Sequence, residues 1–179
     1  MSDGFTLVVL AGLPGTGKST LAERLAEALD APVFSKDRVR AALFDPRHVR
    51  YERAQDDFVV ECLVAAAAHT AEHGPACHAV LDGRTFQRAG QLDALRAQLA
   101  VRGLAERTIE LVADADIARA RLAAQRAHPA ADRGPELYDA LAAQAAPLPG
   151  PKLVLDSGVL APDELARRAL EWLRAELRA

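Results

Sequence analysis

The chain has 179 residues, of which 50% are hydrophobic and 26% are charged, the composition of an ordinary globular domain. Its formal net charge of −3 argues against the basic surface by which proteins hold duplex nucleic acid, so we expect no duplex nucleic acid among its partners. Aromatic residues make up only 4%, too few for a surface on which the bases of single strands stack.

The N-terminal segment and the cysteines indicate the cellular setting. No stretch reaches the roughly 18 uninterrupted apolar residues of a membrane span. A secretory signal has a positively charged region before its apolar run, and the first apolar run of this chain has none before it. Cys62 and Cys77 suggest neither a disulfide framework nor a metal site. We therefore expect a cytoplasmic protein that is not bound to a membrane, and the sequence leaves its oligomeric state open.

Apolar segments of strand length alternate with helical patterns along the whole chain, without repeats or linkers. The strands are expected, in chain order, at residues 5–11, 33–34, 79–82, 107–112 and 152–155. The helices are expected from the end of a glycine-rich loop to residue 30, then at residues 37–43, 56–72, 87–101 and 116–127, from a broken loop at 128–135 to residue 145, and at 163–177. This alternation predicts one α/β domain, residues 1–179, with a parallel sheet covered by helices on both faces.

Residues 12–19 read Gly-Leu-Pro-Gly-Thr-Gly-Lys-Ser and match the phosphate-binding loop G-x-x-x-x-G-K-[ST]. A buried strand before the loop and a helix after it are the context in which backbone N–H groups point at phosphate oxygens. We expect Lys18 to reach the β- and γ-phosphates of ATP during catalysis and the Ser19 hydroxyl to bind Mg²⁺. The predicted nucleotide-binding residues are Gly12, Leu13, Pro14, Gly15, Thr16, Gly17, Lys18, Ser19 and Thr20.

Asp37 follows the second predicted strand, at the edge of the sheet where ligands bind in α/β folds. A carboxylate there can accept the proton of an acceptor hydroxyl, so Asp37 is the candidate catalytic base and part of the acceptor site. The alternative is that Ser35 or Asp37 caps the next helix. Arg40 lies on the same helical face and is expected either to keep Asp37 ionised or to bind an anionic acceptor, unless the two form a simple surface ion pair.

The segment His69-Thr70-Ala71-Glu72-His73 has the pattern H-x-x-E-H of some zinc proteases. Its histidines, four residues apart on a helix, could share a metal. The segment nevertheless stands in the last turn before Gly74, where histidines suit the helix dipole, and no third ligand is evident from the spacing. We therefore favour a structural role for this pattern.

Asp82 ends the third predicted strand, a position from which a carboxylate can orient the waters of Mg²⁺. Arg84 follows it and is a candidate contact of the acceptor, because residues 84–88 and the helices between 37 and 72 should form the acceptor pocket. Tyr51, Arg47 and Arg50 are further candidates, although a solvated surface would explain them equally well.

Four arginines gather around the broken loop, and together with residues 126–136 they predict a lid that closes over the triphosphate. A guanidinium in such a lid would stabilise the charge that develops during phosphoryl transfer. Arg126 is the predicted catalytic arginine, the alternative being a solvated arginine face. The cluster consists of Arg119, Arg121, Arg126 and Arg133.

These segments together resemble a group of small P-loop kinases that includes the kinase domain of phage polynucleotide kinase, zeta toxins and chloramphenicol phosphotransferase. The resemblance implies a five-stranded parallel sheet in the order 2-3-1-4-5, with Mg²⁺ and ATP as cofactors. It also implies that Asp37 is the base, that Arg40 contacts the acceptor, that Asp82 supports the site and that a lid arginine closes over ATP. Residues 131–134 depart from the Ser-Asp-Ala step common in the lids of this group. The resemblance is carried by residues 12–19, 35–40, 81–86 and 121–126.

The sequence therefore predicts an ATP-dependent kinase that phosphorylates a hydroxyl group of a small molecule. A polynucleotide 5′-hydroxyl kinase is one alternative, and a nucleotide-gated ATP-binding protein without a dedicated acceptor is another. A GTP-dependent switch is disfavoured because its guanine-recognition motif N-K-x-D needs asparagine, and the chain contains none. The identity of the acceptor is not encoded in any motif of this sequence.

Overall fold

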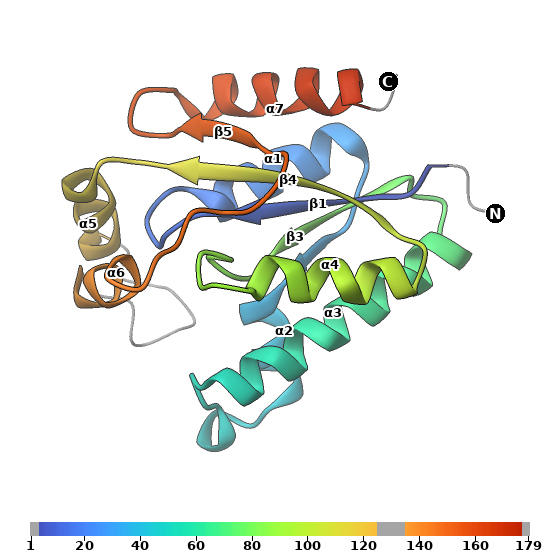
Figure 1. The fold of residues 1–179 in the computed structure, drawn as a ribbon, viewed down its shortest axis with the longest axis horizontal. Helices are drawn as coiled ribbons and strands as arrows, with labels where there is room; N and C mark the ends of the chain where they lie inside the picture. Colours follow the sequence, from blue (N-terminus) through green and yellow to red (C-terminus); the bar gives the residue numbers. More distant parts are fainter. Residues whose placement is uncertain (1–3, 125–134, 177–179) are drawn as a thin grey trace.

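The computed structural model describes residues 4–124 and 135–176 and contains one five-stranded parallel sheet (Figure 1). Its strand order is β2-β3-β1-β4-β5, which confirms the order that the family resemblance implied. The strands are β1 (Thr6–Ala11), β2 (Val33–Ser35), β3 (His78–Asp82), β4 (Ala105–Val112) and β5 (Leu153–Asp156). The helices are α1 (Lys18–Leu29), α2 (Lys36–Leu43), the short 3-10 helix η1 (Pro46–His48), α3 (Arg53–His73), α4 (Gln91–Val101), α5 (Ala115–Ala124), α6 (Pro135–Ala142) and α7 (Pro162–Glu176).

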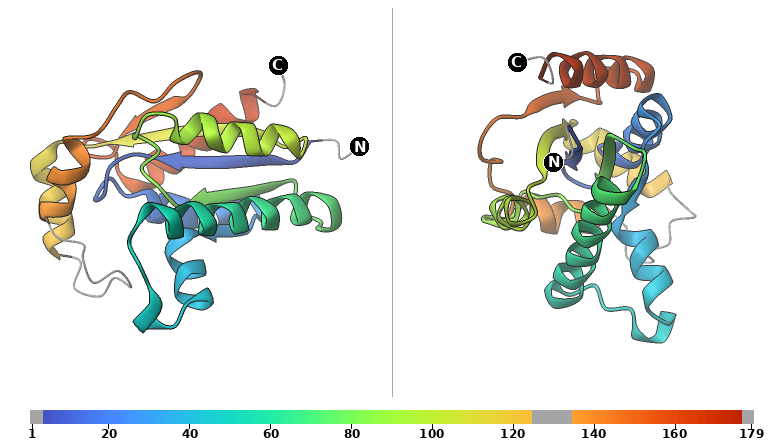
Figure 2. Two further views of the ribbon diagram at one scale, coloured as in Figure 1. Left: turned by 60° about the horizontal axis from the view of Figure 1, so that its bottom comes forward. Right: turned by 90° about the vertical axis from the view of Figure 1, so that its right-hand side faces the viewer.

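Helices cover both faces of the sheet, because every residue of β1 is buried and its side chains alternate between two cores. On one face, Leu7 and Val9 pack with apolar residues of α3 and α4. On the other face, Val8 and Leu10 pack with apolar residues of α1 and α7. Figure 2 shows these two pairs of helices on opposite sides of the sheet. No helix within residues 4–124 and 135–176 is long and apolar enough to cross a membrane.

The chain after β3 differs from the prediction. We expected a helix from residue 87, but α4 begins at Gln91. The backbone of Phe86 has a φ of 57° and that of Gly90 a φ of 77°, both in the left-handed region that a continuous helix does not contain. The Phe86 ring is buried in the core between the sheet, α3 and α4, and its packing supports the unusual backbone. Residues 87–90 therefore form a loop.

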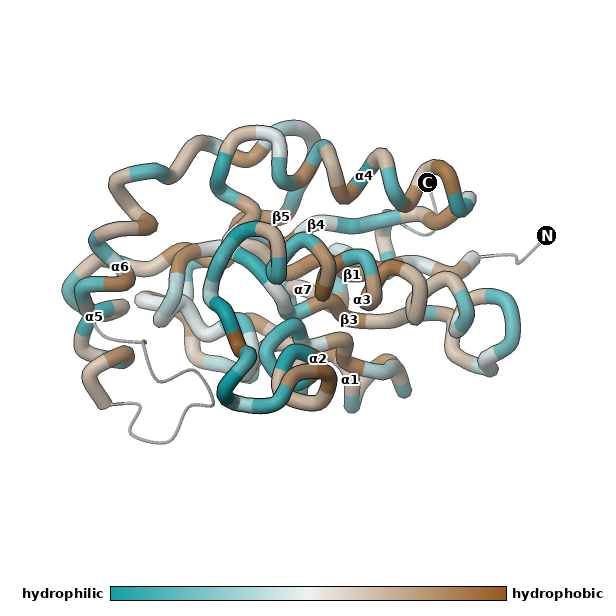
Figure 3. The backbone as a smooth tube through the Cα atoms, turned by 90° about the horizontal axis from the view of Figure 1, so that it is seen from below, coloured by the Kyte–Doolittle hydropathy of each residue, from teal (hydrophilic) through white to brown (hydrophobic). Residues whose placement is uncertain are grey.

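The ends of three strands meet at one edge of the sheet. Asp82 at the end of β3 is in register with Leu10 of β1 on one side and with Ser35 of β2 on the other. The phosphate-binding loop continues directly from β1, and α2 begins immediately after β2. The segment between α2 and α3 passes below this edge and is largely hydrophilic, as the teal colour in Figure 3 shows. The predicted site residues are thus assembled from three separate strand ends.

Candidate active site

The phosphate-binding loop lies so close to its neighbours that two of its glycines have no room for a side chain. Gly12 has a φ of +132°, and a Cβ atom there would lie 2.2 Å from the carbonyl oxygen of Leu111 in β4. Gly15 has a φ of +79°, and its Cβ would lie 2.5 Å from the carbonyl oxygen of Ala118 in α5. The N–H of Gly12 also donates to the Thr85 carbonyl at 3.0 Å. The loop therefore needs glycine at both positions to pack this closely against β4 and α5.

Lys18 bends back over the loop that precedes it. Its Nζ donates to the carbonyl oxygens of Gly12 at 2.8 Å and of Leu13 at 2.9 Å, while Thr16 Oγ1 donates to the same Leu13 oxygen at 2.8 Å. Since α1 begins at Lys18, the N–H groups of its first turn follow directly after the loop. Helix dipole and ammonium charge together favour a polyanion such as a triphosphate at this place.

Arg121 and Arg119 are both bound within the fold rather than projecting over the loop. Arg121 Nη1 donates to Ser157 Oγ at 3.0 Å and to the Gly15 carbonyl at 3.3 Å, and Nη2 donates to the Ser157 carbonyl at 2.8 Å. Arg119 contacts two carboxylates and the ring of Tyr138. Arg121 thereby connects the loop to the end of β5. Arg126, Arg133 and most of the predicted lid lie outside the described residues.

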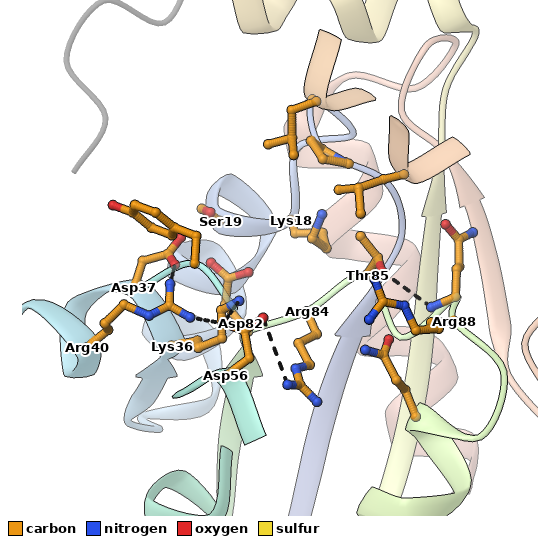
Figure 4. A pocket seen from close by; sticks show the side chains of 18 of the residues that line it. Lys18, Ser19, Lys36, Asp37, Arg40, Asp56, Asp82, Arg84, Thr85 and Arg88 are labelled. Atoms are coloured by element: carbon orange, nitrogen blue, oxygen red, sulfur yellow. Dashed lines mark hydrogen bonds and ion pairs between the residues drawn. The ribbon is translucent and has the colours of Figure 1, made fainter. Parts of the chain in front are cut away.

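A cavity of about 290 Å³ opens at the edge of the sheet where the strand ends meet. The loop residues Lys18 and Ser19 line it, and so do Asp37, the predicted base, and Asp82, the predicted metal ligand (Figure 4). A second cavity of about 240 Å³ shares Ser19, Asp37 and Asp82 with the first. The remaining predicted nucleotide residues on the wall of the first cavity are Pro14, Gly15, Gly17 and Thr20, and the predicted acceptor residues there are Arg40, Tyr51 and Arg84.

The central contact of the cavity is between Arg40 and two carboxylates. Arg40 Nη1 lies 3.3 Å from Asp37 Oδ1, and Nη2 donates to Asp56 Oδ1. Only 3% of Arg40 is exposed, so the pair with Asp37 is not a simple surface ion pair. The guanidinium also lies over the Tyr51 ring, 5.2 Å from its centroid. Arg40 is therefore held on three sides.

Asp56 is the residue that sequence reasoning missed. Besides Arg40 it contacts Lys36, with 3.1 Å from Nζ to Oδ1, and Arg84, with 3.8 Å from Nη2 to Oδ2. Its neighbour Asp57 accepts from Arg84 Nη2 at 2.7 Å. Burial raises the pKa of Asp57, but the hydrogen bond and the charge of Arg84, with help from Arg53, lower it more. The only sequence signal was a pair of adjacent aspartates, one at the expected start of a helix.

Ser19 and Asp82 line the same cavity and supply an alcohol and a carboxylate oxygen. The Asp82 carboxylate forms no hydrogen bond or ion pair with any residue in the described part of the chain. Oxygen ligands of this kind suit Mg²⁺, which keeps several waters and takes further ligands from substrate phosphates. No group of three or more His, Cys, Asp or Glu residues within 4–124 and 135–176 could hold an ion by itself. These residues therefore fit a metal that arrives with a nucleotide.

Other residues considered from the sequence lie away from the cavity. Arg47 pairs with Asp45, and Arg50 donates to backbone carbonyls of its own segment. The rings of His69 and His73 contact each other at the end of α3, tilted by 52° with centroids 4.7 Å apart, and do not line the cavity. The structural role that we favoured for this pattern is consistent with that position.

Solved structures of small kinases share this fold over almost their whole length. A sugar kinase from Janibacter sp. HTCC2649 superimposes with a TM-score of 0.70 and 19% identity, covering 96% of this chain and 95% of that one. The APS kinase CysC of Mycobacterium tuberculosis, solved with AMPPNP and APS, superimposes with a TM-score of 0.69 and 21% identity. The match covers 96% of this chain and 98% of that one. A gluconokinase from Sinorhizobium meliloti 1021 superimposes with a TM-score of 0.68 and 16% identity, covering 99% of this chain and 95% of that one. At these identities the likeness establishes the fold.

No curated protein matches the sequence. A family model described as an AAA domain, AAA_33, matches residues 7–148, which is well over half of the chain and includes the loop, Asp37, Asp56 and Asp82. The chain therefore belongs to the AAA_33 family of AAA domains and has the fold of the small P-loop kinases.

Proposed function

We propose that this protein is an ATP-dependent phosphotransferase that moves the γ-phosphoryl group of ATP to a hydroxyl group of a small molecule. The observation that carries the proposal is that Asp37, a carboxylate held by a buried arginine, lines the same cavity as Lys18 of the phosphate-binding loop. Structural neighbours that are kinases of small molecules, one of them solved with the ATP analogue AMPPNP, support it.

In the proposed reaction the triphosphate lies in the loop, with backbone N–H groups and Lys18 around its β- and γ-phosphates. The acceptor oxygen attacks the γ-phosphorus and forms a new O–P bond. The bond between that phosphorus and the β–γ bridging oxygen breaks, and ADP leaves. Asp37 takes the proton of the acceptor hydroxyl, which needs the carboxylate to be ionised and within hydrogen-bond reach.

Arg40 and the metal ligands complete the proposed site. Arg40 fixes the Asp37 carboxylate at the cavity wall through the contact between Nη1 and Oδ1. Its contact with the acceptor, expected from the family resemblance, remains part of the proposal. Ser19 and Asp82 would hold Mg²⁺, directly or through water, and the ion would neutralise charge on the β- and γ-phosphates.

Transfer from ATP to a panel of hydroxyl-bearing metabolites, with phosphorylated products detected by mass spectrometry, tests the proposal. Short single strands with a free 5′-hydroxyl belong in the panel, tested at low salt because phosphate contacts weaken with salt. We expect Asp37→Asn to lower kcat by roughly 10²–10⁴ while ATP binding stays intact. Asp93→Asn on the exposed side of α4 is the matched control.

Two results would contradict the proposal in different ways. If calorimetry with magnesium detects no ATP binding, the phosphate site itself is wrong. If ATP binds tightly but no acceptor raises the turnover, a nucleotide-gated binding protein becomes the better description. Unchanged turnover in Asp37→Asn would remove Asp37 as the base and leave the kinase activity standing.

A further inference from the structure

The cavity of the candidate active site has an apolar wall that the proposed chemistry does not use. Its aliphatic side chains, among the described lining residues, are Pro14 of the phosphate-binding loop and Leu137 and Leu141 of α6. The two leucines are partly buried and stand four residues apart, which places them on one face of the helix. Apart from Tyr51, the other described side chains that line the cavity are polar or charged. A ligand in this cavity therefore meets an apolar surface as well as a charged one.

The direction in which the two leucines face is set by the contact between α6 and α5. Tyr138 and Ala142 of α6 pack with apolar residues of α5, and the guanidinium of Arg119 in α5 lies 5.4 Å from the centroid of the Tyr138 ring. Figures 1 and 2 both show the two helices side by side. Leu137 and Leu141 each precede one of the packed residues, so they stand about 100° around the helix from the contact with α5. This contact holds the leucine pair toward the cavity.

The leucine pair does not serve the packing of the fold. Neither Leu137 nor Leu141 belongs to any of the three apolar cores within residues 4–124 and 135–176. Apolar side chains in a ligand cavity stabilise a complex when an apolar part of the ligand covers them. The triphosphate has no such part, because its charged oxygens bind backbone N–H groups and Lys18. The cover must therefore come from elsewhere in the two substrates.

The size of the cavity indicates which substrate supplies the apolar part. Its volume of about 290 Å³ is at the lower end of sites that hold one drug-sized ligand, so it cannot hold a whole nucleotide and an acceptor together. With the phosphates held at the loop, the space that is left beside them suits the acceptor, and the adenosine lies outside. The carbon body of the acceptor is then the group that covers the two leucines.

Tyr51 adds a second apolar surface beside the proposed base. Its side chain lines the cavity, is 50% exposed and lies with its ring 5.2 Å from the guanidinium of Arg40, which contacts Asp37. The ring comes from the segment between α2 and α3, whereas the leucines come from α6. An acceptor whose hydroxyl reacts at Asp37 therefore has an aromatic ring next to its reacting end.

The charges around Asp37 are offset within the protein. Three cations of the cavity wall contact three carboxylates in this region. An anionic group beside the reacting hydroxyl would compete with these carboxylates for the same cations, and Asp37 itself would repel it. The arrangement therefore disfavours an acceptor with such a group. The contacts pair Lys36 with Asp56, Arg40 with Asp37 and Asp56, and Arg84 with Asp57.

We propose that the acceptor is a small alcohol with an apolar carbon body and no anionic group beside its reacting hydroxyl. The hydroxyl stands at Asp37 with the Tyr51 ring next to it, and the carbon body packs against Leu137 and Leu141. The inference rests on the proposed kinase function and specifies its substrate class.

Phosphoryl transfer from ATP to matched alcohols tests this inference. Each set contains an apolar alcohol, a polyol with the same carbon skeleton, and a hydroxy acid whose carboxylate is next to the hydroxyl. One set is cyclohexanol, hexahydroxycyclohexane and 2-hydroxycyclohexanecarboxylate, and another is 1-hexanol, a hexitol and 2-hydroxyhexanoate. We expect the kcat/KM of the apolar alcohol to exceed those of both partners at least about tenfold in one set or more. The inference is overturned if no apolar alcohol exceeds its partners.

Substitutions in α6 show whether the leucines cause this preference. Leu141→Asn puts a polar side chain of similar size in the wall and should lower the preference about tenfold, whereas Leu141→Met keeps the wall apolar and should retain it. Val101→Asn, which changes an 86% exposed residue at the end of α4, is the matched control and should behave as the wild type. Urea unfolding verifies that each variant is folded. A preference that survives in folded Leu141→Asn would overturn the inference.

Measurements with ATP and AMPPNP separate the inference from two other roles of the wall. If Leu141→Asn hydrolyses ATP faster without an acceptor while the order of the acceptors stays the same, the leucines only keep water from the γ-phosphate, and the inference fails. If the variant loses AMPPNP affinity with the same order of acceptors, the leucines belong to the nucleotide site, and the inference fails again. Absence of ATP binding in the wild type would end the proposed function as well. Phosphorylation of polyols or hydroxy acids alone would refute the substrate class and leave the kinase standing.

Discussion

Arg40 Nη1 donates to Asp37 Oδ1 across 3.3 Å, joining a nearly inaccessible cation to the carboxylate that we propose as the base. Asp56 accepts from the other side of the same guanidinium. A planar group with several donors can hold two carboxylates at once, which a single ammonium group does less well. The geometry of Asp37 thus depends on a residue of α3 that lies 19 positions away in the chain.

Removing Arg40 should harm stability and catalysis together. Arg40→Met leaves Asp37 and Asp56 close to each other without the cation between them, and we expect a loss of about 3 kcal/mol in the free energy of unfolding. The kcat should fall at least about tenfold because Asp37 loses its fixed position. Urea unfolding and ADP release measure the two effects. Full activity in Arg40→Met would show that Asp37 needs no such support.

Asp56 and Asp57 provide a matched pair of substitutions. Asp56→Asn weakens contacts with Lys36, Arg40 and Arg84, and we expect it to cost about 2 kcal/mol in stability and to lower kcat. Asp57→Asn weakens contacts with Arg84 and Arg53 only, at a position that is 45% exposed, and should cost less than about 1 kcal/mol. Equal effects in the unfolding and activity assays would contradict a central role for Asp56.

The glycines offer a test of the loop geometry. Gly12→Ala places a Cβ 2.2 Å from the Leu111 carbonyl, so the loop must move, and we expect ATP affinity measured by calorimetry to fall at least about tenfold. Gly103→Ala is the control, because it also has a positive φ but nothing within 4 Å of the new Cβ. That variant should lose only about 1–2 kcal/mol of stability from backbone strain and should bind ATP normally.

His78 makes the stability of the protein sensitive to acid. Burial lowers its pKa below the ordinary value of 6.5, and its Nε2 is buried without a partner in the described part of the chain. The unfolded chain therefore binds a proton more readily than the folded one. The contribution of His78 is complete above about pH 6.5 and is lost as the pH falls through the lower, folded-state pKa.

Urea unfolding between pH 8 and pH 5 measures this effect. His78→Gln should lose stability less steeply below pH 6.5 than the wild type. His48→Gln, which changes an exposed histidine of η1, controls for the loss of one titratable group. Parallel curves for the wild type and His78→Gln would contradict the prediction.

The sequence predicted most of the fold because its signals are local. Strands and helices alternate clearly, and a glycine-rich loop between a strand and a helix has few other structures open to it. The place of Asp37 on the cavity wall was predicted by the same reasoning, because Asp37 comes shortly after a strand. The start of α4 was predicted too early because the residue type of Phe86 does not indicate its left-handed backbone. A glycine at position 86 would have indicated it.

The parts of the site that were missed depend on contacts between distant residues. An aspartate in the first turn of a helix normally suits the helix dipole, so nothing in its neighbourhood marked Asp56 as the partner of three cations. The arginine cluster was visible, but only the folded chain shows that Arg121 contacts Ser157, 36 residues further on. Residue spacing gives the elements, whereas pairing across elements comes from packing.

The buried ring of Phe86 has a consequence for how this protein could diversify. It anchors the end of a strand in the core, and the four residues that follow it are free of regular structure before α4 begins. Gln87, Arg88 and Gln91 line the cavity and do not belong to the core that holds the Phe86 ring, so substitutions there change the cavity wall without disturbing that core. Under the proposed function, the exchange of a few side chains there would change which acceptor the cavity admits and would leave the phosphate-binding loop as it is.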